Sequence, residues 1–394
     1  MLRLRLYLLI LLALLLPAFA ARAAALLDLA GAEALPPPPK VDARAWLLME
    51  ARTGQVLAAG QPDQRLPQAS LTKLMTAYVV LRAAKAGQIR LDDPVTIGDK
   101  AWRTGGSRIY LNKGDQVPVE TLLRGLLANS GNDAAVALAE HLGGSLEGFA
   151  ALMNQAAAQL GLSNSHFVTP HGLHHPDHYT SARDLGILAR AIILEFPEHY
   201  PLFGLKSFTY GKVTQRNRNR LLWREDSAVD GMKTGFTVPA RYCVVNSAQR
   251  GELRLISIVL GAPNPQVRFE NSAALLDYGF SHYRLDTLVA PAQPLTEVRV
   301  WGATAKRLPL GLTEPLYLLR VRAPSEPVRL EFEAPEFELN GTLSVGDAYG
   351  RLRAYLGQKL IHQQSLYALQ PLQESGFFAR AADAAQRLWE EWFN

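Results

Sequence analysis

The stretch from Gln68 to Tyr78, "QASLTKLMTAY", is predicted to begin a helix that is apolar on nearly every side. A helix that is apolar all round is usually buried inside a protein. Burying an unpaired ammonium group has a large free-energy cost, yet Lys73 lies in the first turn of this helix, three residues after Ser70. The presence of a lysine in this apolar helix therefore needs an explanation from the rest of the sequence.

Ser70 and Lys73 have the spacing of two residues on one face of a helix, one turn apart. A serine at a helix N-terminus lies near free N–H groups, which favour developing negative charge. A lysine that is shielded from water has a lowered pKa and acts as a base. The pair is a candidate nucleophile with its activating base. Taken alone, the pair is better explained by a serine that caps the helix and a lysine whose ammonium reaches solvent.

A second motif is Ser130-Gly131-Asn132, at a break between two predicted helices. The Ser130 hydroxyl could relay a proton there, and the Asn132 amide could hold a substrate carbonyl. In isolation, a turn with helix capping is the better interpretation of this motif.

A third motif is Lys233-Thr234-Gly235, on a predicted strand. A strand edge pairs with an extended peptide through its backbone, and Gly235 allows that backbone to approach closely. The ammonium of Lys233 and the hydroxyl of Thr234 suit a substrate carboxylate. The alternative is a solvated lysine before a turn.

The N-terminus has the pattern of an export signal. Arg3 and Arg5 precede an apolar run at residues 6–16, followed by Pro17 and small residues, which is the order of a signal peptide. The run is too short for an ordinary membrane span. We therefore predict a signal peptide at residues 1–24, with an uncleaved anchor as the less favoured alternative, and a Pro-rich linker at 25–40.

Composition and charge exclude some classes of protein. The 394 residues carry a net charge of +5 without a dense Lys/Arg block, so we predict no nucleic-acid partner. Cys243 is the single cysteine, which excludes an internal disulfide. The fold must therefore be stabilised by its core.

The order of predicted elements indicates an α+β fold. Residues 45–60 form a predicted hairpin, 70–162 and 181–196 are mostly helical, and 232–260 contain strands followed by a returning helix. An early hairpin, a helical middle and late strands imply an antiparallel sheet completed by distant segments and flanked by helices. We assign the catalytic domain to residues 41–284.

The C-terminal part has a different sequence pattern. Recurring prolines between short alternating stretches predict a small all-β domain at residues 286–368, and residues 369–394 are predicted to form an amphipathic helix. Phe377, Phe378, Trp389 and Trp392 fall near one face of this helix, which suits an interfacial helix with aromatic anchors. The alternative is a helix docked on the β domain.

The three motifs occur in the order S-x-x-K, S-x-N and K-T-G, each on a suitable element. This set is typical of penicillin-binding proteins and class A β-lactamases. With segments such as "SGNDAAVALAEH", "SARDLGILARAI" and "VDGMKTGFT", the sequence resembles low-molecular-weight penicillin-binding proteins that are serine-type D-Ala-D-Ala carboxypeptidases. The resemblance covers essentially the whole mature chain. It implies a penicillin-binding/β-lactamase-like transpeptidase domain, with the terminal helix at the periplasmic face of the bacterial inner membrane.

The resemblance implies a role for each motif residue. Ser70 would be the nucleophile that forms an acyl-enzyme, Lys73 its general base, and Ser130 the proton relay to the leaving amine. The implied substrate-binding residues are Asn132, Lys233, Thr234, Gly235, Phe236 and Arg218. Asn132 would orient the substrate, and the backbone N–H groups of Ser70 and Phe236 would form the oxyanion hole.

The resemblance also implies partners and leaves alternatives. The substrates would be peptidoglycan stem pentapeptides, and β-lactam antibiotics would be covalent inhibitors; no cofactor or metal is expected. A D,D-endopeptidase of peptidoglycan cross-links is an alternative that the motifs barely distinguish. A β-lactamase is less favoured, because class A enzymes use a loop glutamate and residues 170–183 contain none. A wall-binding protein without turnover is disfavoured by the intact motifs.

Two residues depart from the common pattern of the family: Arg220 stands where many members have glycine, and Arg241 stands where glycine is usual. Phe236, after K-T-G, is common in the family, while some members have histidine there. None of these changes removes a group with a catalytic role.

A histidine cluster lies at residues 171–178, with His171 and His178 near its two ends and Asp177 between them. Such a cluster could bind a metal. We favour a structural loop beside the active site, in which His171 and His178 make hydrogen bonds.

Overall fold

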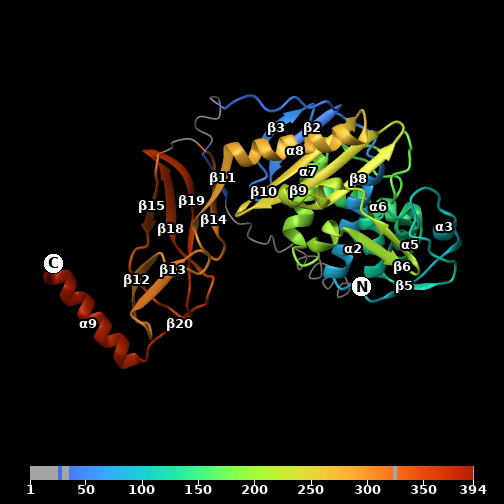
Figure 1. The fold of residues 1–394 in the computed structure, drawn as a ribbon. Coiled ribbons are helices and arrows are strands. Elements are labelled where there is room, and N and C mark those ends of the chain that lie inside the picture. The colour runs from blue at the N-terminus through green and yellow to red at the C-terminus, as the bar shows by residue number, and fades with distance from the viewer. Residues whose placement is uncertain (1–24, 29–34, 323–325, 394) are drawn as a thin grey trace, which may run out of the picture. The chain divides into compact units, whose positions relative to one another are not determined.

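The computed structural model describes residues 25–28, 35–322 and 326–393, so the predicted signal peptide lies outside the described residues. The described chain divides into two compact units (Figure 1). One contains residues 35–284 and 321–322, and the other contains 25–28, 285–320 and 326–393. Each unit is described by itself.

The larger unit is built on a five-stranded sheet with the order β3-β2-β10-β9-β8 and antiparallel neighbours. The strands are β2 (Ala45–Glu50), β3 (Val56–Gly60), β8 (Val229–Thr237), β9 (Arg241–Arg250) and β10 (Leu253–Ala262). The predicted antiparallel sheet, completed by segments distant in the sequence, is confirmed. β8 is an edge strand, which leaves one side of its backbone open to a ligand.

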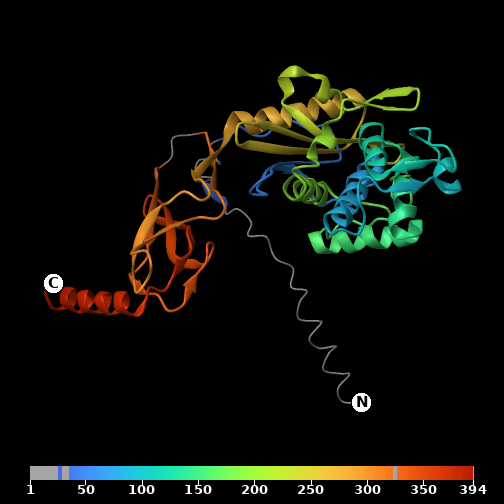
Figure 2. The ribbon, with the colours of Figure 1, turned by 90° about the horizontal axis from the view of Figure 1, so that it is seen from below.

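Helices cover both faces of this sheet. They are α2 (Thr72–Lys85), α3 (Asp99–Arg103), α4 (Val119–Ala128), α5 (Asn132–Gly143), α6 (Leu146–Leu160), α7 (Ala182–Glu195) and α8 (Pro265–His282). α8 packs on β2, β9 and β10, and α7 contacts β2 and β10; Figure 2 shows the sheet between α8 and the helices from the middle of the chain. Coverage on both faces explains why β10 is apolar along nearly its whole length.

Short elements complete the larger unit. They are the 3₁₀ turns η2 (Ala69–Leu71), η3 (Tyr200–Gly204), η4 (Arg220–Trp223) and η5 (Glu225–Ser227), and two antiparallel strand pairs, β4 (Pro94–Thr96) with β5 (Gln116–Pro118) and β6 (Ser207–Tyr210) with β7 (Val213–Arg216). The predicted break between two helices is the gap between α4 and α5, which contains Ser130.

The smaller unit is a β domain with a terminal helix, as predicted. A three-stranded sheet has the order β1-β14-β11, and a six-stranded sheet has the order β15-β18-β19-β13-β12-β16. The elements are β1 (Ala25–Asp28), β11 (Tyr283–Val289), β12 (Thr296–Trp301), β13 (Arg307–Gly311), β14 (Leu316–Val321), β15 (Val328–Glu333), β16 (Phe337–Glu338), β17 (Thr342–Leu343), β18 (Ala348–Leu356), β19 (Lys359–Ala368), β20 (Leu372–Gln373) and α9 (Phe377–Phe393). β1 lies in the segment expected to be a linker and pairs in parallel with β14.

Asp133 ties α5 to the loop before it, and we predict that Asp133→Ala destabilises the larger unit. The buried carboxylate accepts hydrogen bonds from the backbone N–H groups of Ile109, Tyr110, Leu111 and Ala134. Its loss leaves buried donors unsatisfied, so the free energy of unfolding should fall by about 3 kcal/mol in chemical denaturation.

Asp99→Ala is the matched control. Asp99 makes surface ion pairs with Arg103 and Lys113, and such pairs contribute less than about 1 kcal/mol. Equal destabilisation by the two substitutions would contradict the role given to Asp133.

Candidate active site

Ser70 lies in the 3₁₀ turn η2, directly before α2. The sequence placed it at a helix N-terminus; the α-helix itself begins two residues later, at Thr72. Ala69 has a left-handed φ of 49°, a conformation that is unfavourable for a residue with a Cβ. Thr72 Oγ1 donates to the Ala69 carbonyl at 2.8 Å. This bond holds the strained backbone immediately before Ser70.

Lys73 is fully buried in the first turn of α2. Its Nζ lies 3.1 Å from Ser70 Oγ, 2.7 Å from Asn132 Oδ1 and 2.8 Å from the His171 carbonyl oxygen. The last two atoms are acceptors only. In a neutral amine the two N–H groups therefore bond to Asn132 and His171, and the lone pair faces the Ser70 hydroxyl.

The surroundings of Lys73 favour this neutral form. Burial lowers its pKa well below the ordinary value of a lysine, and the charge of Lys233 lowers the pKa further; Asp133 acts in the opposite direction, and Arg218 adds a smaller lowering. A neutral amine beside a serine hydroxyl is the arrangement of a general base and its nucleophile.

The Ser130-Gly131-Asn132 segment brings Ser130 and Asn132 into the site. Ser130 has a left-handed φ of 63°, is 5% exposed, and its Oγ has no hydrogen-bond partner among the described residues. Asn132 is the first residue of α5, and its Nδ2 donates to the Gly105 carbonyl at 2.7 Å. The strained backbone thus presents a hydroxyl that is free to exchange a proton.

The Lys233-Thr234-Gly235 segment lies on the edge strand β8. Lys233 Nζ donates to the Thr234 carbonyl at 3.1 Å. Burial lowers the pKa of Lys233 to about 7, with further lowering by Arg218 and Arg268. A Cβ at Gly235 would lie 3.2 Å from the Ser70 nitrogen, so glycine lets β8 approach the turn that carries the nucleophile.

The predicted residues meet at one cavity of about 370 Å³. Its lining is Ser70, Gly106, Ser107, Ser130, Asn132, Gly172, Leu173, Arg218, Thr234, Gly235, Phe236, Thr237, Tyr242 and Arg268. Lys73 and Lys233 are buried behind this lining. The lining contains arginines and no carboxylate, so it is complementary to an anionic ligand.

Several lining residues were not among the predicted site residues. Ser107 accepts a hydrogen bond from Arg218 Nη1 at 2.9 Å. Tyr242 packs against Phe236 with ring centroids 4.5 Å apart. Arg268 comes from the first turn of α8. These residues belong to no short motif, and the chain brings them to the site from separate elements.

Arg220 and Arg241, which the resemblance sets against family glycines, lie near the site. Arg241 is exposed at the start of β9, opposite Thr237, with a left-handed φ of 55°. Glycine adopts this conformation without strain; nothing in the structure explains the arginine. Arg220 is exposed at the start of η4.

The histidine loop supports the site through hydrogen bonds. The Val168 N–H donates to His178 Nδ1 at 2.9 Å, so His178 Nε2 carries the proton and donates to Thr72 Oγ1 at 2.7 Å. Thr72 in turn holds Ala69. The expected hydrogen bonds of His171 and His178 are both present, and no cluster that could hold a metal occurs among the described residues.

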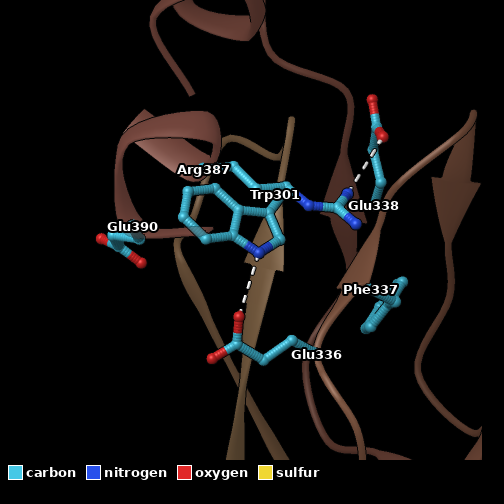
Figure 3. Close-up of a pocket in the computed structure, with 6 residues that line it drawn as sticks. All are labelled: Trp301, Glu336, Phe337, Glu338, Arg387 and Glu390. Atoms are coloured by element: carbon cyan, nitrogen blue, oxygen red, sulfur yellow. Dashed lines mark hydrogen bonds and ion pairs between the residues drawn. The ribbon is translucent and has the colours of Figure 1, made fainter. Parts of the chain in front are cut away.

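A second candidate surface lies on α9. Its charged side docks on the β domain: Arg299 makes two hydrogen bonds to the Glu390 carboxylate, and the buried Asp383 accepts from Lys306 and from the Gly302 N–H. Figure 3 shows Arg387 reaching Glu338 beside a pocket of about 310 Å³ under this helix.

The other side of α9 is apolar and exposed. Its large exposed residues are Phe377, Phe378, Leu388, Trp389 and Trp392, with exposed fractions from 58% to 87%. At 3.6 residues per turn they fall within an arc of about 120°, opposite the ion-paired residues. The two interpretations of the tail are therefore compatible, because docking uses the charged face and leaves the aromatic face outward.

His178 gives a pH-dependent prediction. Burial lowers the pKa of His178 to about 3, from an ordinary 6.5. The folded state therefore disfavours the proton that the unfolded state binds below pH 6.5, and stability is lost as the pH falls from 6.5 toward 3. His178→Gln, measured by denaturation at several pH values, should reduce this loss by about 1.4 kcal/mol per pH unit below about pH 6. An unchanged pH dependence would contradict the neutral, buried state of His178.

Comparisons with known proteins show the family of the chain. Residues 32–264 match the D-alanyl-D-alanine carboxypeptidase family, and residues 283–374 match the C-terminal domain of penicillin-binding protein 5. The D-alanyl-D-alanine carboxypeptidase DacC of Escherichia coli is 42% identical over 361 residues, 90% of each chain. The crystal structure of penicillin-binding protein 5 from Haemophilus influenzae is similar with a TM-score of 0.73 and 38% identity, covering 86% of this chain and 100% of that one. Penicillin-binding protein 6B of Escherichia coli has a TM-score of 0.69 and 36% identity, covering 84% and 96%. The chain therefore belongs to the D-alanyl-D-alanine carboxypeptidase family of penicillin-binding proteins.

Proposed function

We propose that this protein removes the terminal D-alanine from peptidoglycan stem pentapeptides, with Ser70 as nucleophile and Lys73 as general base. The observation that carries the proposal is the position of Lys73 Nζ, 3.1 Å from Ser70 Oγ and bonded to two further oxygen atoms that only accept. This geometry directs the amine lone pair at the serine proton.

The reaction follows from these positions. Ser70 Oγ attacks the carbonyl carbon between the two D-alanines while Lys73 takes its proton. The N–H groups of Ser70 and Phe236 stabilise the developing oxyanion. Ser130 passes a proton from Lys73 to the leaving amine, the C–N bond breaks, and D-alanine departs. Water then hydrolyses the ester and restores Ser70.

The charges of the cavity support recognition of the substrate carboxylate. Thr234 and Arg218 line the cavity, and Lys233 lies behind Thr234. A carboxylate placed here would receive charge-assisted hydrogen bonds. Gly235 allows the edge of β8 to approach an extended peptide closely.

The alternative activities considered from the sequence are a D,D-endopeptidase and a β-lactamase. An endopeptidase would use the same residues on a cross-linked peptide, so only product analysis separates it from a carboxypeptidase. A β-lactamase is disfavoured by the loop at 170–183, which contains no glutamate to activate water against the acyl-enzyme.

We further propose that the protein is exported and associates peripherally with the periplasmic face of the inner membrane through α9. The exposed aromatic face of α9 is the observation that supports this. No helix of the described chain is long and apolar enough to cross a bilayer. Binding would be mainly apolar, because the charged side of the helix is engaged in ion pairs with the β domain.

The central prediction concerns release of D-alanine. The purified protein should release D-alanine from a stem pentapeptide, and Ser70→Ala should reduce the rate to background. Absence of release by a wild-type protein that is still labelled by penicillin would refute the carboxypeptidase activity. Release of a stem peptide from a cross-linked dimer would favour the endopeptidase.

Lys73→Arg tests the general base. Arginine stays protonated at neutral pH and cannot accept the serine proton, so acylation of Ser70 by a β-lactam should fall roughly 1,000-fold. Stopped-flow or gel-based labelling measures this rate. Acylation within a few-fold of the wild type would show that Lys73 is not the base.

The membrane proposal predicts that the double variant Trp389→Ser/Trp392→Ser binds phospholipid vesicles about tenfold or more weakly, because two large apolar groups no longer leave water. Vesicle sedimentation measures binding. Trp102→Ser, at a 43% exposed tryptophan outside α9, is the matched control. Equal binding by all three proteins would exclude α9 as the membrane contact.

A further inference from the structure

Arg268 is a buried cation that none of the proposed catalytic steps uses. It lies in the first turn of α8, is 6% exposed and lines the active-site cavity. Its guanidinium lies over the rings of Phe269 and Tyr242 at 4.4 and 5.7 Å. No ion pair joins it to a carboxylate of the described chain, and its Nε has no hydrogen-bond partner there. Burying a charge in this way costs desolvation free energy, so the position of Arg268 needs an explanation.

The contacts of Arg268 converge on the edge strand. Nη1 donates to the Gly235 carbonyl oxygen and to the Cys243 carbonyl oxygen, each at 3.2 Å. Gly235 and Cys243 are partners in the β8–β9 ladder. The guanidinium therefore binds β8 at the glycine that lies against the Ser70 turn.

The carbonyl of Gly235 and the N–H of Phe236 belong to one peptide group. The two ends of a trans peptide point in opposite directions, and successive residues of a strand direct their hydrogen-bonding groups to opposite edges. When the Gly235 carbonyl faces Arg268, the Phe236 N–H faces the open edge of β8, where the substrate carbonyl would lie. A cation on the carbonyl oxygen polarises the whole peptide group and strengthens its N–H as a donor.

We propose that Arg268 is a positioning residue of the oxyanion hole, which fixes the plane of the Gly235–Phe236 peptide and polarises the Phe236 N–H toward the reacting carbonyl. This inference rests on the proposed roles of Ser70 and Phe236. Arg268 itself need not touch the substrate. The lack of a carboxylate beside Arg268 in the described chain fits this role, because a carboxylate would neutralise the charge that polarises the peptide.

A purely structural role would use the same two hydrogen bonds, to clamp β8 to β9. The two roles differ in what they change. A clamp changes stability and the shape of the cavity, whereas polarisation changes the strength of the oxyanion hole. The carbonyl stretching frequency of the acyl-enzyme ester reports the second property directly, because stronger donors lower the frequency.

The experiment compares Arg268→Met, Arg268→Gln and Arg268→Lys with the wild type. A β-lactam labelled with ¹³C at its reactive carbonyl acylates each protein, and difference infrared spectroscopy records the ester band. Stopped-flow kinetics separates the acylation rate constant from the dissociation constant of the non-covalent complex. Arg220→Gln is the control: it removes a nearby charge that already influences Arg268 without removing a donor to Gly235.

We expect Arg268→Met to slow acylation about tenfold, a fraction of the effect of losing a whole oxyanion-hole donor. The dissociation constant should stay within about twofold, and the ester band should move to higher frequency. Arg268→Lys should recover part of both effects, since it restores a cation, and Arg268→Gln should fall between Met and Lys. Arg220→Gln should match the wild type in rate and frequency.

Slower acylation with an unchanged ester band would overturn the inference and leave Arg268 as a clamp. Wild-type rates and frequencies in all three variants would also overturn it. If Arg268→Met does not fold, the difference between Lys and Gln, which differ in charge at the same position, decides the question. Labelling of Ser70→Ala at the wild-type rate would instead refute the proposed nucleophile, whatever the Arg268 variants show.

Discussion

The amine of Lys73 is enclosed by three oxygen atoms and by the apolar side chains of α2, and the site depends on this burial. A lysine at such a place is stable only as a neutral amine or with several good acceptors. The three oxygen atoms come from different segments: Ser70 from the adjacent turn η2, Asn132 from the start of α5, and the His171 carbonyl from the histidine loop. Placing these oxygen atoms around one buried amine therefore brings together the nucleophile Ser70, the side-chain amide of Asn132 and the histidine loop.

The excess of positive charge around this amine has a second consequence. Burial and the charge of Lys233 lower the pKa of Lys73, and Arg218, which lines the same cavity as Ser70, lowers it too. The repulsion between Lys233 and Arg218 weakens the free site and is relieved when an anionic substrate enters. The binding energy of the substrate carboxylate thus comes partly from positive charges that the fold has gathered around the site.

The sequence was sufficient for the parts of the fold that have strong local patterns. The apolar helix after Ser70, the break at Ser130 and the late strands around Lys233 all follow from periodicity and turn residues, and the order of the motifs indicated the family. The left-handed Ala69 and the contacts of Arg268 could not be predicted, because both depend on tertiary neighbours. Local propensity describes what a residue prefers, whereas an active site holds some residues where they would not otherwise lie.

The terminal helix α9 is a second case in which the sequence pattern was not sufficient. Its amphipathic pattern was evident, yet the pattern alone left docking and membrane contact as rival interpretations. The structure shows the docking: the side facing the β domain is held by ion pairs such as Arg299 to Glu390 and by the buried carboxylate of Asp383. Ion pairs need defined partners at defined distances, whereas an apolar face needs only a surface without water. A helix with its charged face fixed in this way keeps its aromatic face exposed. For the proposed membrane contact, the ordering entropy of the helix would already be lost when the domain folds, so association would not have to offset it.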